Sequence, residues 1–249
     1  MRLPDDVSIV MAAKNEARSI GAIVTACRPL AAEVIVVADR ECHDRTVAVA
    51  EAAGARVIVD AGRGKGHAMV RGLAEVRTAI TVFIDADGSH DPADIPKLVA
   101  PLVNGAAEHV SASRLTGGSS ELHGGFDEFF RLAGSSFITA CINWRFGVRL
   151  SDSQNGFRAI LTDVCRDLGL TSQSTTIEQE MIMKSLRRGY RIVEVPSHEH
   201  ERLFGSSNIS VRRDCLKYAL SLLTGLAFAG SARTRSAAVA VERGAAVPR

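Results

Sequence analysis

The first half of the chain alternates between short apolar runs and segments with helical spacing. The apolar runs are VSIVMAA, EVIVVAD, ARVIVDA, AITVFIDAD and EHVSASR. Between the first two runs, four apolar residues have the i, i+3, i+4, i+7 spacing of one helix face: Ile20, Ile23, Val24 and Cys27. Near-continuous apolar strands that alternate with helices are typical of a mostly parallel sheet covered on both faces. We therefore predict an α/β fold.

Polar residues follow these apolar runs. Ligands of parallel sheets bind at the carboxyl ends of the strands, so the polar residues there should meet at one rim. They are Asn15, Glu16, Asp39, Asp44, Lys65, Asp85 and Asp87. Explanations without a ligand stay open, because Asn15 or Asp44 could cap a helix and Lys65 could be solvated.

Asp85 and Asp87 end a buried run with only Ala86 between them. Gly88 and Pro92 favour a turn here, in which carboxylates accept backbone hydrogen bonds. Two carboxylates at this spacing can also bind Mg²⁺ or Mn²⁺, with phosphate oxygens completing the coordination. The two interpretations are compatible, and we expect a metal site.

Composition limits the class of protein. The 249 residues, 46% of them apolar, suffice for a sizeable core in one domain. Residues 231–249 hold four arginines and one glutamate, which leaves 26 basic and 27 acidic side chains elsewhere, so no nucleic acid partner is expected. The five cysteines form no CxxC pair and are interpreted as thiols of a reducing compartment. The sequence lacks a recognisable signal peptide, and its longest apolar run, YALSLLTGLAFAG, is shorter than the roughly 20 residues that span a bilayer. A cytoplasmic protein is predicted.

Eight motifs, in order, resemble those of the family 2 glycosyltransferases, which have the GT-A fold. They are SIVMAAKNEARSI, VIVVADRECHDRT, GRGKGHAMVRGL, FIDADGSHDPADIPKLV, SASR, DSQNGFRAI, IEQEMIMKSLRRGYRIVEVP and ERLFGSSNI. Within that family, the sequence is most similar to the polyprenyl-phosphate (dolichol-phosphate) mannose synthase branch. The resemblance implies a GT-A domain over residues 1–212. Beyond it, the apolar run predicts a helix over 213–230 that packs on the domain, a partner subunit or a membrane surface. Residues 231–249 have the composition of a disordered tail.

The resemblance implies a donor site for a nucleotide sugar. Asp85 and Asp87 match the DxD motif that holds Mg²⁺ or Mn²⁺ against the diphosphate. The third metal ligand stays open among Ser89, His198 and His200, and an exposed strand edge would also explain the two histidines. The other matching positions are Ala12, Asn15, Glu16, Asp39, Lys65, Ala86, Arg202 and Ser207. The usual DDGSxD segment is ADRECHD here, so the base stays open between guanine and uracil.

The implied reaction is an inverting transfer of a hexose from a GDP- or UDP-sugar. Asp87 and Arg202 would stabilise the charge of the leaving diphosphate. The acceptor phosphate of polyprenyl phosphate would be contacted at the positions of Arg114, Arg131 and Ser135. A hydroxyl acceptor would instead need a base, and the candidates are Glu178 and Glu180. Glu180 and Lys184 also have the spacing of a helical ion pair.

Residues 123–146 hold six of the twelve aromatic side chains. Core packing explains most of them, and the rest could form an acceptor groove or a face that meets lipid. We therefore expect either polyprenyl phosphate, used at the inner face of the membrane, or a soluble hydroxyl or phosphate acceptor of small-metabolite biosynthesis. The oligomeric state stays open, and a homodimer is one expectation. An inactive nucleotide-sugar-binding protein and a nucleotidyltransferase are the other classes considered, but the intact carboxylate pair and Arg202 favour a glycosyltransferase.

Overall fold

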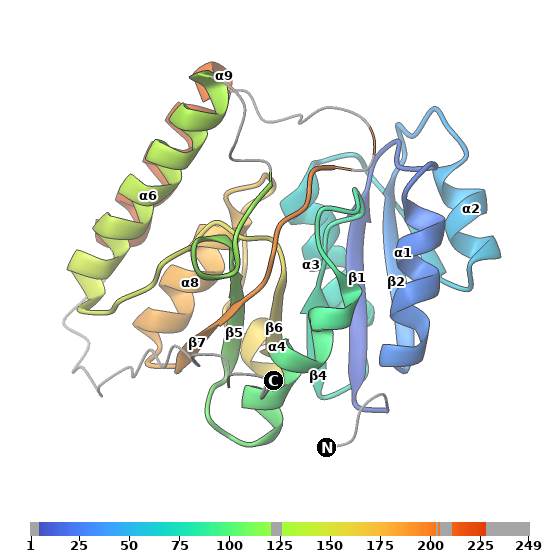
Figure 1. Ribbon diagram of the computed structural model, residues 1–249, viewed down its shortest axis with the longest axis horizontal. Helices are drawn as coiled ribbons and strands as arrows, with labels where there is room; N and C mark the ends of the chain where they lie inside the picture. The colour runs from blue at the N-terminus through green and yellow to red at the C-terminus, as the bar shows by residue number, and fades with distance from the viewer. Residues whose placement is uncertain (1–4, 121–125, 203, 205–210, 228–249) are drawn as a thin grey trace, which may run out of the picture.

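A computed structural model of the chain describes residues 5–120, 126–202, 204 and 211–227 (Figure 1). One seven-stranded sheet runs through it in the order β3-β2-β1-β4-β6-β5-β7. Its strands are β1 (Val7–Ala13), β2 (Glu33–Asp39), β3 (Arg56–Asp60), β4 (Ile80–Phe83), β5 (His109–Ser113), β6 (Arg158–Leu161) and β7 (Ile192–Pro196). Only β6 is antiparallel to its neighbours, β4 and β5, among these strands. The predicted mostly parallel sheet is confirmed.

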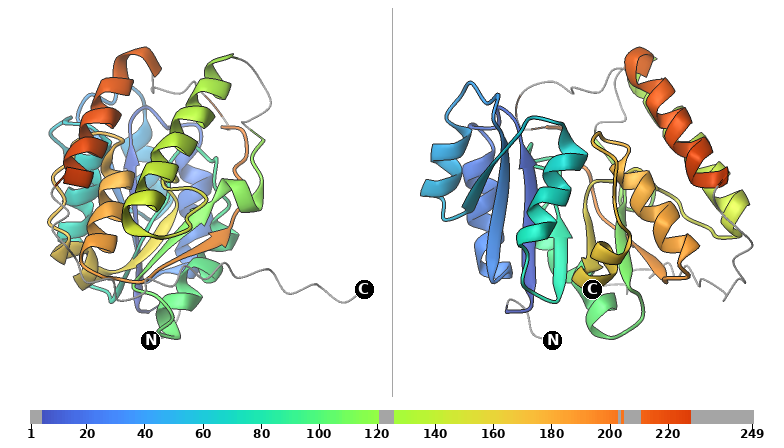
Figure 2. Two further views of the ribbon diagram at one scale, coloured as in Figure 1. Left: turned by 90° about the vertical axis from the view of Figure 1, so that its left-hand side faces the viewer. Right: turned by 180° about the vertical axis from the view of Figure 1, so that it is seen from behind.

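Helices cover both faces of this sheet (Figures 1 and 2). The α-helices are α1 (Ile20–Cys27), α2 (Thr46–Ala52), α3 (Lys65–Glu75), α4 (Ile95–Val103), α5 (Arg114–Gly117), α6 (Phe126–Phe146), α7 (Thr162–Asp167), α8 (Ile177–Arg187) and α9 (Val211–Ala227). Two 3-10 helices, η1 (Arg28–Leu30) and η2 (Pro92–Asp94), join them. Among the described residues, none of the helices combines the length and the apolar character needed to cross a membrane.

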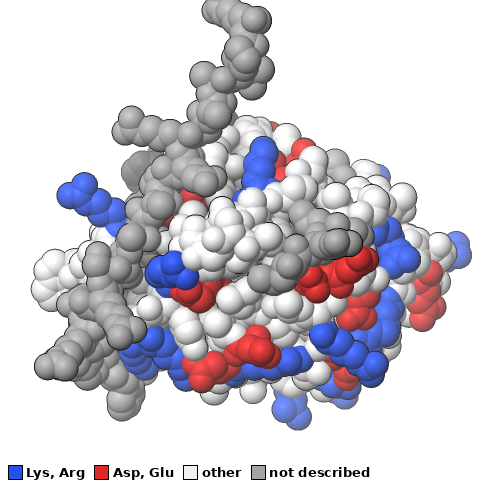
Figure 3. All heavy atoms as spheres, turned by 90° about the horizontal axis from the view of Figure 1, so that it is seen from below, with Lys and Arg blue, Asp and Glu red and all other residues white. Residues whose placement is uncertain are grey.

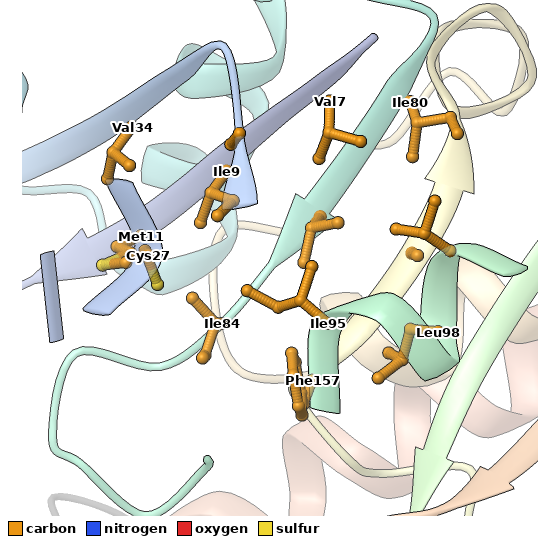
Figure 4. Close-up of a cluster of buried hydrophobic side chains, with 14 of the residues drawn as sticks. Val7, Ile9, Met11, Cys27, Val34, Ile80, Ile84, Ile95, Leu98 and Phe157 are labelled. Atoms are coloured by element: carbon orange, nitrogen blue, oxygen red, sulfur yellow. The ribbon is translucent and has the colours of Figure 1, made fainter. Parts of the chain in front are cut away.

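The alternation of β1 supplies the two cores on either side of the sheet. Val7, Ile9 and Met11 point to one face, where they pack with residues of α1 and α4 (Figure 4). Val10 points to the other face and packs with residues of α3 and α8. Because successive side chains of a strand alternate between faces, a strand that is apolar at every position must be buried on both.

A third core lies where α9 packs against α6 and α8. Leu222 of α9, Ile142 of α6 and Ile182 of α8 are all buried there. Figures 1 and 2 show α6 and α9 side by side at one end of the molecule. The predicted C-terminal helix therefore packs on the domain. The predicted disordered tail lies outside the described residues.

The face that holds the amino ends of the parallel strands carries charges of both signs. Figure 3 shows Lys and Arg beside Asp and Glu over the described part of this face. Like charges are not segregated there, in keeping with a near-neutral composition.

Candidate functional site

A cavity of about 970 Å³ opens at the carboxyl ends of β1 to β4. This volume matches the upper end of the usual range for small-molecule sites. Most of the predicted donor-site residues line it: Ala12, Asn15, Glu16, Asp39, Lys65, Asp85, Ala86, Asp87 and Arg202. Ser89, Arg114 and Glu178 also lie in its wall. The structure thus brings together residues that are far apart in the sequence.

Asp87 is buried in the turn that follows β4, and its carboxylate contacts both this turn and the guanidinium of Arg202. Its Oδ1 accepts hydrogen bonds from the backbone amide of Ser89 at 3.0 Å and from the Ser89 hydroxyl at 2.7 Å. Its Oδ2 lies 3.1 Å from Nη2 of Arg202. The predicted turn is present: it satisfies one carboxylate oxygen of Asp87, and the other oxygen pairs with Arg202 in the cavity wall.

Arg202 reaches Asp87 because the chain after β7 runs back along the DxD turn. Glu199 forms an antiparallel bridge with His90, and the His200 amide donates to the carbonyl of Ser89 at 2.8 Å. Arg202 follows His200 by two residues, so this attachment brings its guanidinium to the turn that holds Asp87.

Lys65 joins Asp85 to Glu178. Its Nζ lies 2.6 Å from Asp85 Oδ1 and 2.8 Å from Glu178 Oε1. Burial alone would lower the pKa of Lys65, but the two carboxylates outweigh it and raise this pKa above the usual value. Burial alone would raise the pKa of Asp85, yet Lys65 holds it well below the usual range. A Cβ on Gly156 would come within 2.6 Å of Asp85 Oδ2, so the glycine leaves room for this bridge.

The loop after β1 is shaped by backbone and side-chain hydrogen bonds. Asn15 has a φ of 58°, and its Oδ1 accepts from the amide of His43 at 2.8 Å. The amide of Glu16 donates to the hydroxyl of Thr46 at 2.8 Å. Burial raises the pKa of the Glu16 carboxyl. The loop is thereby held against the start of α2, with Asn15 and Glu16 at the cavity.

Asp44 is not the N-cap of α2, which is Arg45, but it lies directly before that residue and holds the start of the helix. Its carboxylate accepts from the amides of Ala17 at 3.0 Å and Thr46 at 2.9 Å, so it fixes the start of α2 as well as the loop after β1. Asp39 pairs with Lys14 at 3.2 Å and accepts from the Glu41 amide at 2.8 Å. Both carboxylates remain in the cavity wall.

The model of the glycosyl transferase family 2 matches residues 8–167, more than half of the chain. This chain is a family 2 glycosyltransferase. It is 29% identical over 216 residues to Glycosyltransferase AglJ of Haloferax volcanii, covering 86% of this chain and 70% of that one. It is 30% identical to the Dolichyl-phosphate hexose transferase of the same organism, covering 80% of this chain and 84% of the relative.

A solved structure confirms the GT-A fold of this glycosyltransferase. The glucosyl-3-phosphoglycerate synthase of Mycobacterium tuberculosis, in complex with Mn²⁺, UDP and glucosyl-3-phosphoglycerate, superposes with a TM-score of 0.69. The superposition covers 90% of this chain and 81% of the synthase, at 23% sequence identity. At 23% identity, the similarity supports the fold alone, so the acceptor has to be inferred from the chemistry of the site.

Glu180 does not reach the cavity of the glycosyltransferase. Its carboxylate accepts from the amides of Thr171 and Ser172 and pairs with Nζ of Lys184 at 2.7 Å. The expectation that it acts as a base is wrong, because these partners hold it behind the wall, where it orders the loop before α8. The helical ion pair with Lys184 is confirmed.

The two histidines after β7 are not placed as metal ligands. His198 Nε2 lies 2.8 Å from the Ser120 hydroxyl, and its Nδ1 lies 3.3 Å from the Gly117 carbonyl, so both ring nitrogens have protein partners. His200 is exposed and its ring stacks edge-on against His198. Neither lines the described cavity wall. Ser89 does, although its hydroxyl donates to Asp87.

The predicted acceptor residues are divided. Arg114 lines the cavity and makes two bonds to Asp152, at 2.6 and 3.0 Å, with Glu199 at 3.5 Å. Ser135 lies on α6 and is not part of the described wall, because α6 packs away from the sheet with α8 and α9. The side chain of Arg131 and the whole of Ser207 lie outside the described residues.

Sequence reasoning missed several residues of the cavity wall. They are Arg18, Arg63, Gln154, Gly156, Thr175, Glu199, Phe204 and Tyr218. Gln154 and Gly156 belong to the DSQNGF motif, so their motif was a usable signal. Arg18 lies 3.8 Å above the ring of Phe204, a cation–π contact between segments almost 190 residues apart that no local pattern indicates.

Proposed function

We propose that this glycosyltransferase moves a hexose from a nucleotide sugar to polyprenyl phosphate, with inversion and with the help of a divalent cation. The main support is the cavity in which Asp85 and Asp87 face Lys65 and Arg202. Carboxylates and cations at one site suit a diphosphate that is bound together with a metal ion.

The residues of the cavity fit Mg²⁺ or Mn²⁺. Asp85 and Asp87 offer the oxygen ligands that these ions prefer. Among the described residues, no group of three or more His, Cys, Asp and Glu side chains could hold a metal by itself, so diphosphate oxygens and water would complete the coordination. The described wall carries eight carboxylates against six Lys and Arg side chains, and a bound diphosphate adds further negative charge that a divalent cation offsets.

The protein's own groups then act on the leaving diphosphate and on the acceptor. A bound cation would neutralise charge on the diphosphate, and Arg202 beside Asp87 would stabilise the same charge as it develops. An ionised phosphate oxygen of the acceptor attacks the anomeric carbon while the bond to the diphosphate breaks. No proton has to be removed from such an acceptor. Arg114 lines the cavity and would position the acceptor phosphate. Its contact with Glu199 is 3.5 Å long, so an acceptor phosphate could replace this contact more easily than the 2.6 Å contact with Asp152.

An exposed apolar surface favours a lipid acceptor. Phe137 and Trp144 of α6 are 66% and 83% exposed, and Leu216, Leu220 and Leu223 of α9 are 65%, 53% and 62% exposed. Large exposed apolar residues on neighbouring helices are typical of a surface that meets membrane or protein. We infer that the enzyme works at the inner face of a membrane.

The competing function uses the same donor with a soluble acceptor. It is favoured by Glu178, which lies in the cavity wall and could take the proton of a hydroxyl. The solved relative named above is a glucosyl-3-phosphoglycerate synthase, which illustrates such an acceptor on this fold.

Donor binding followed by turnover separates the two functions. Melting temperature is measured with Mn²⁺ and a panel of GDP- and UDP-sugars, and the best donor is then assayed with polyprenyl phosphate or with 3-phosphoglycerate. A metal-dependent shift with turnover only on the lipid is the expected result. Turnover on the soluble acceptor alone would replace polyprenyl phosphate, and the absence of any metal-dependent shift would contradict the donor site itself.

A further inference from the structure

The last described helix, α9, contributes to the cavity. Tyr218 of α9 lies in the cavity wall together with Thr175, in the turn before α8, and Glu178, in the first turn of α8. The Tyr218 hydroxyl donates to Oγ1 of Thr175 at 2.7 Å. The side-chain amide of Gln179 donates to the Tyr218 carbonyl at 3.2 Å, which ties the two helices together on the same side. The family match ends at residue 167, so this part of the wall lies beyond it.

Glu178 has one carboxylate oxygen with a partner and one without. Oε1 pairs with Lys65, whereas Oε2 is buried and lacks a hydrogen-bond partner among the described residues. The Glu178 side chain is only 3% exposed. A buried acceptor without a donor is costly, so a ligand donor is expected at this oxygen.

The chemistry of the proposed substrates identifies that donor. Neither the diphosphate nor an ionised acceptor phosphate carries a proton to donate, and both would be repelled by a carboxylate. The hydroxyl groups of the hexose are donors. Lys65 links Glu178 to Asp85, so the hexose of a nucleotide sugar whose diphosphate is bound at Asp85 would come near the Glu178 carboxylate.

We propose that Glu178, Thr175 and Tyr218 form the subsite that binds the hexose of the donor, and that α9 completes the active site through Tyr218. The proposal rests on the proposed nucleotide-sugar donor. Glu178 accepts a hydrogen bond from a sugar hydroxyl. Tyr218, held by Thr175, presents its ring and its phenolic oxygen to the same sugar, because an aromatic ring can pack on the C–H face of a hexose while its oxygen bonds to a hydroxyl.

Paired binding measurements test this subsite. GDP, UDP, GDP-mannose and UDP-glucose are titrated, with Mn²⁺, into the wild type and into Tyr218→Phe and Thr175→Val. Both variants should bind the preferred nucleotide sugar about fivefold more weakly, the factor that one hydrogen bond contributes, and should bind the matching nucleoside diphosphate as the wild type does. Thr224→Ala is the matched control, since it removes a hydroxyl from α9 that bonds only to the helix backbone at Leu220 and Ser221.

The possible outcomes separate this subsite from the donor site. A loss confined to the nucleotide sugar supports the subsite. Equal losses for nucleotide sugar and nucleoside diphosphate would reveal a structural role for Tyr218 and overturn it, as would unchanged binding of both. If the wild type bound none of the four probes, the proposed donor itself would be wrong, and the subsite with it.

Discussion

The two halves of the sheet differ in the side chains that they bury: the half around β1, β2 and β4 is apolar, and the half around β5, β6 and β7 is partly polar. Around β1, β2 and β4, the buried side chains are almost all apolar, with Ile9, Ile35 and Val82 fully buried. Around β5, β6 and β7, the buried side chains include ions: Arg158 is 0% exposed and Glu194 is 1% exposed. Glu194 accepts from the amides of Ser151 and Asp152 at 2.7 and 2.8 Å, and Arg158 donates to the Glu178 carbonyl at 3.0 Å.

This difference follows from what each half positions. The apolar half carries its part of the cavity on strand ends and short loops, so packing holds the strands and a few local hydrogen bonds, such as that of Glu16 with Thr46, hold the loops. The polar half must fix Arg114, through its partner Asp152, and Glu178 at a wall that several distant segments share. Buried hydrogen bonds specify such an arrangement more narrowly than apolar contacts.

The largest expected effect lies at the junction of the two halves. Asp87→Asn keeps the size of the side chain and the acceptor for Ser89, but removes the charge that pairs with Arg202. We expect kcat/KM for glycosyl transfer to fall by about 10³-fold, roughly 4 kcal/mol of transition-state stabilisation. Steady-state kinetics with Mn²⁺ measure it, and Asp163→Asn, at a side chain 98% exposed, is the matched control. Turnover within tenfold of the wild type would mean that Asp87 is not at the reacting diphosphate.

A smaller effect is expected on stability, where Lys65 connects the halves. Lys65→Met leaves Asp85 and Glu178 facing each other without the shared cation. Breaking one partner of a buried ion pair typically costs about 3 kcal/mol or more. Because Lys65 and Asp85 are 24% and 27% exposed, the free energy of unfolding in urea should fall by about 2.5 kcal/mol. Lys97→Met is the comparison, because its side chain is 62% exposed and pairs only within its own turn. Equal losses in the two variants would show that the bridge adds no stability.

The apolar half was the predictable one. Its strands are near-continuous apolar runs and its helices have apolar residues every three or four positions, so the alternation of the two patterns predicted the elements and the rim on which Asn15, Asp39 and Asp85 meet. Asp44 could not be assigned from sequence, because a capping carboxylate and a ligand-binding carboxylate occupy the same position after a strand.

The polar half could not be predicted in the same way from the pattern of apolar residues, and the reason is physical. A buried ion such as Arg158 interrupts the apolar period that identifies a core strand. Glu178 and Glu180 are two residues apart on one helix, yet one lines the cavity and the other lies behind it, and only the loop at 171–172 decides between them. No motif indicated that Tyr218 lines the cavity, since its position in the wall depends on how α9 packs on α8.

A substitution of Arg114, in the polar half, tests whether this half binds the acceptor. Arg114→Lys keeps the positive charge but loses the two-bond geometry toward Asp152. We expect KM for polyprenyl phosphate to rise about 30-fold, near 2 kcal/mol, while the Kd of the nucleotide sugar stays the same. Initial rates at varied lipid and titrations of the donor measure the two values, with exposed Arg149→Lys as the control. Weaker donor binding in Arg114→Lys would move this residue to the donor side.

The smallest effect concerns the buried polar groups beneath the acceptor side. His109 is fully buried on β5, with Nδ1 3.0 Å from the hydroxyl of Ser185. Burial, with the charge of Arg158 as the second cause, holds the pKa of His109 well below its usual value of 6.5. The unfolded chain therefore takes up a proton below pH 6.5 that the folded protein refuses, and stability falls as the pH decreases through that range.

Between pH 7.5 and 5.5, this one group should remove about 1.4 kcal/mol from the free energy of unfolding. His109→Asn keeps a polar atom near Ser185 but cannot titrate, so the difference between its urea curves at the two pH values should be smaller than that of the wild type by this amount. The other histidines are common to both proteins and cancel in the comparison. Parallel pH dependences would show that His109 is protonated in the folded state, and that the polar half tolerates a second buried cation beside Arg158.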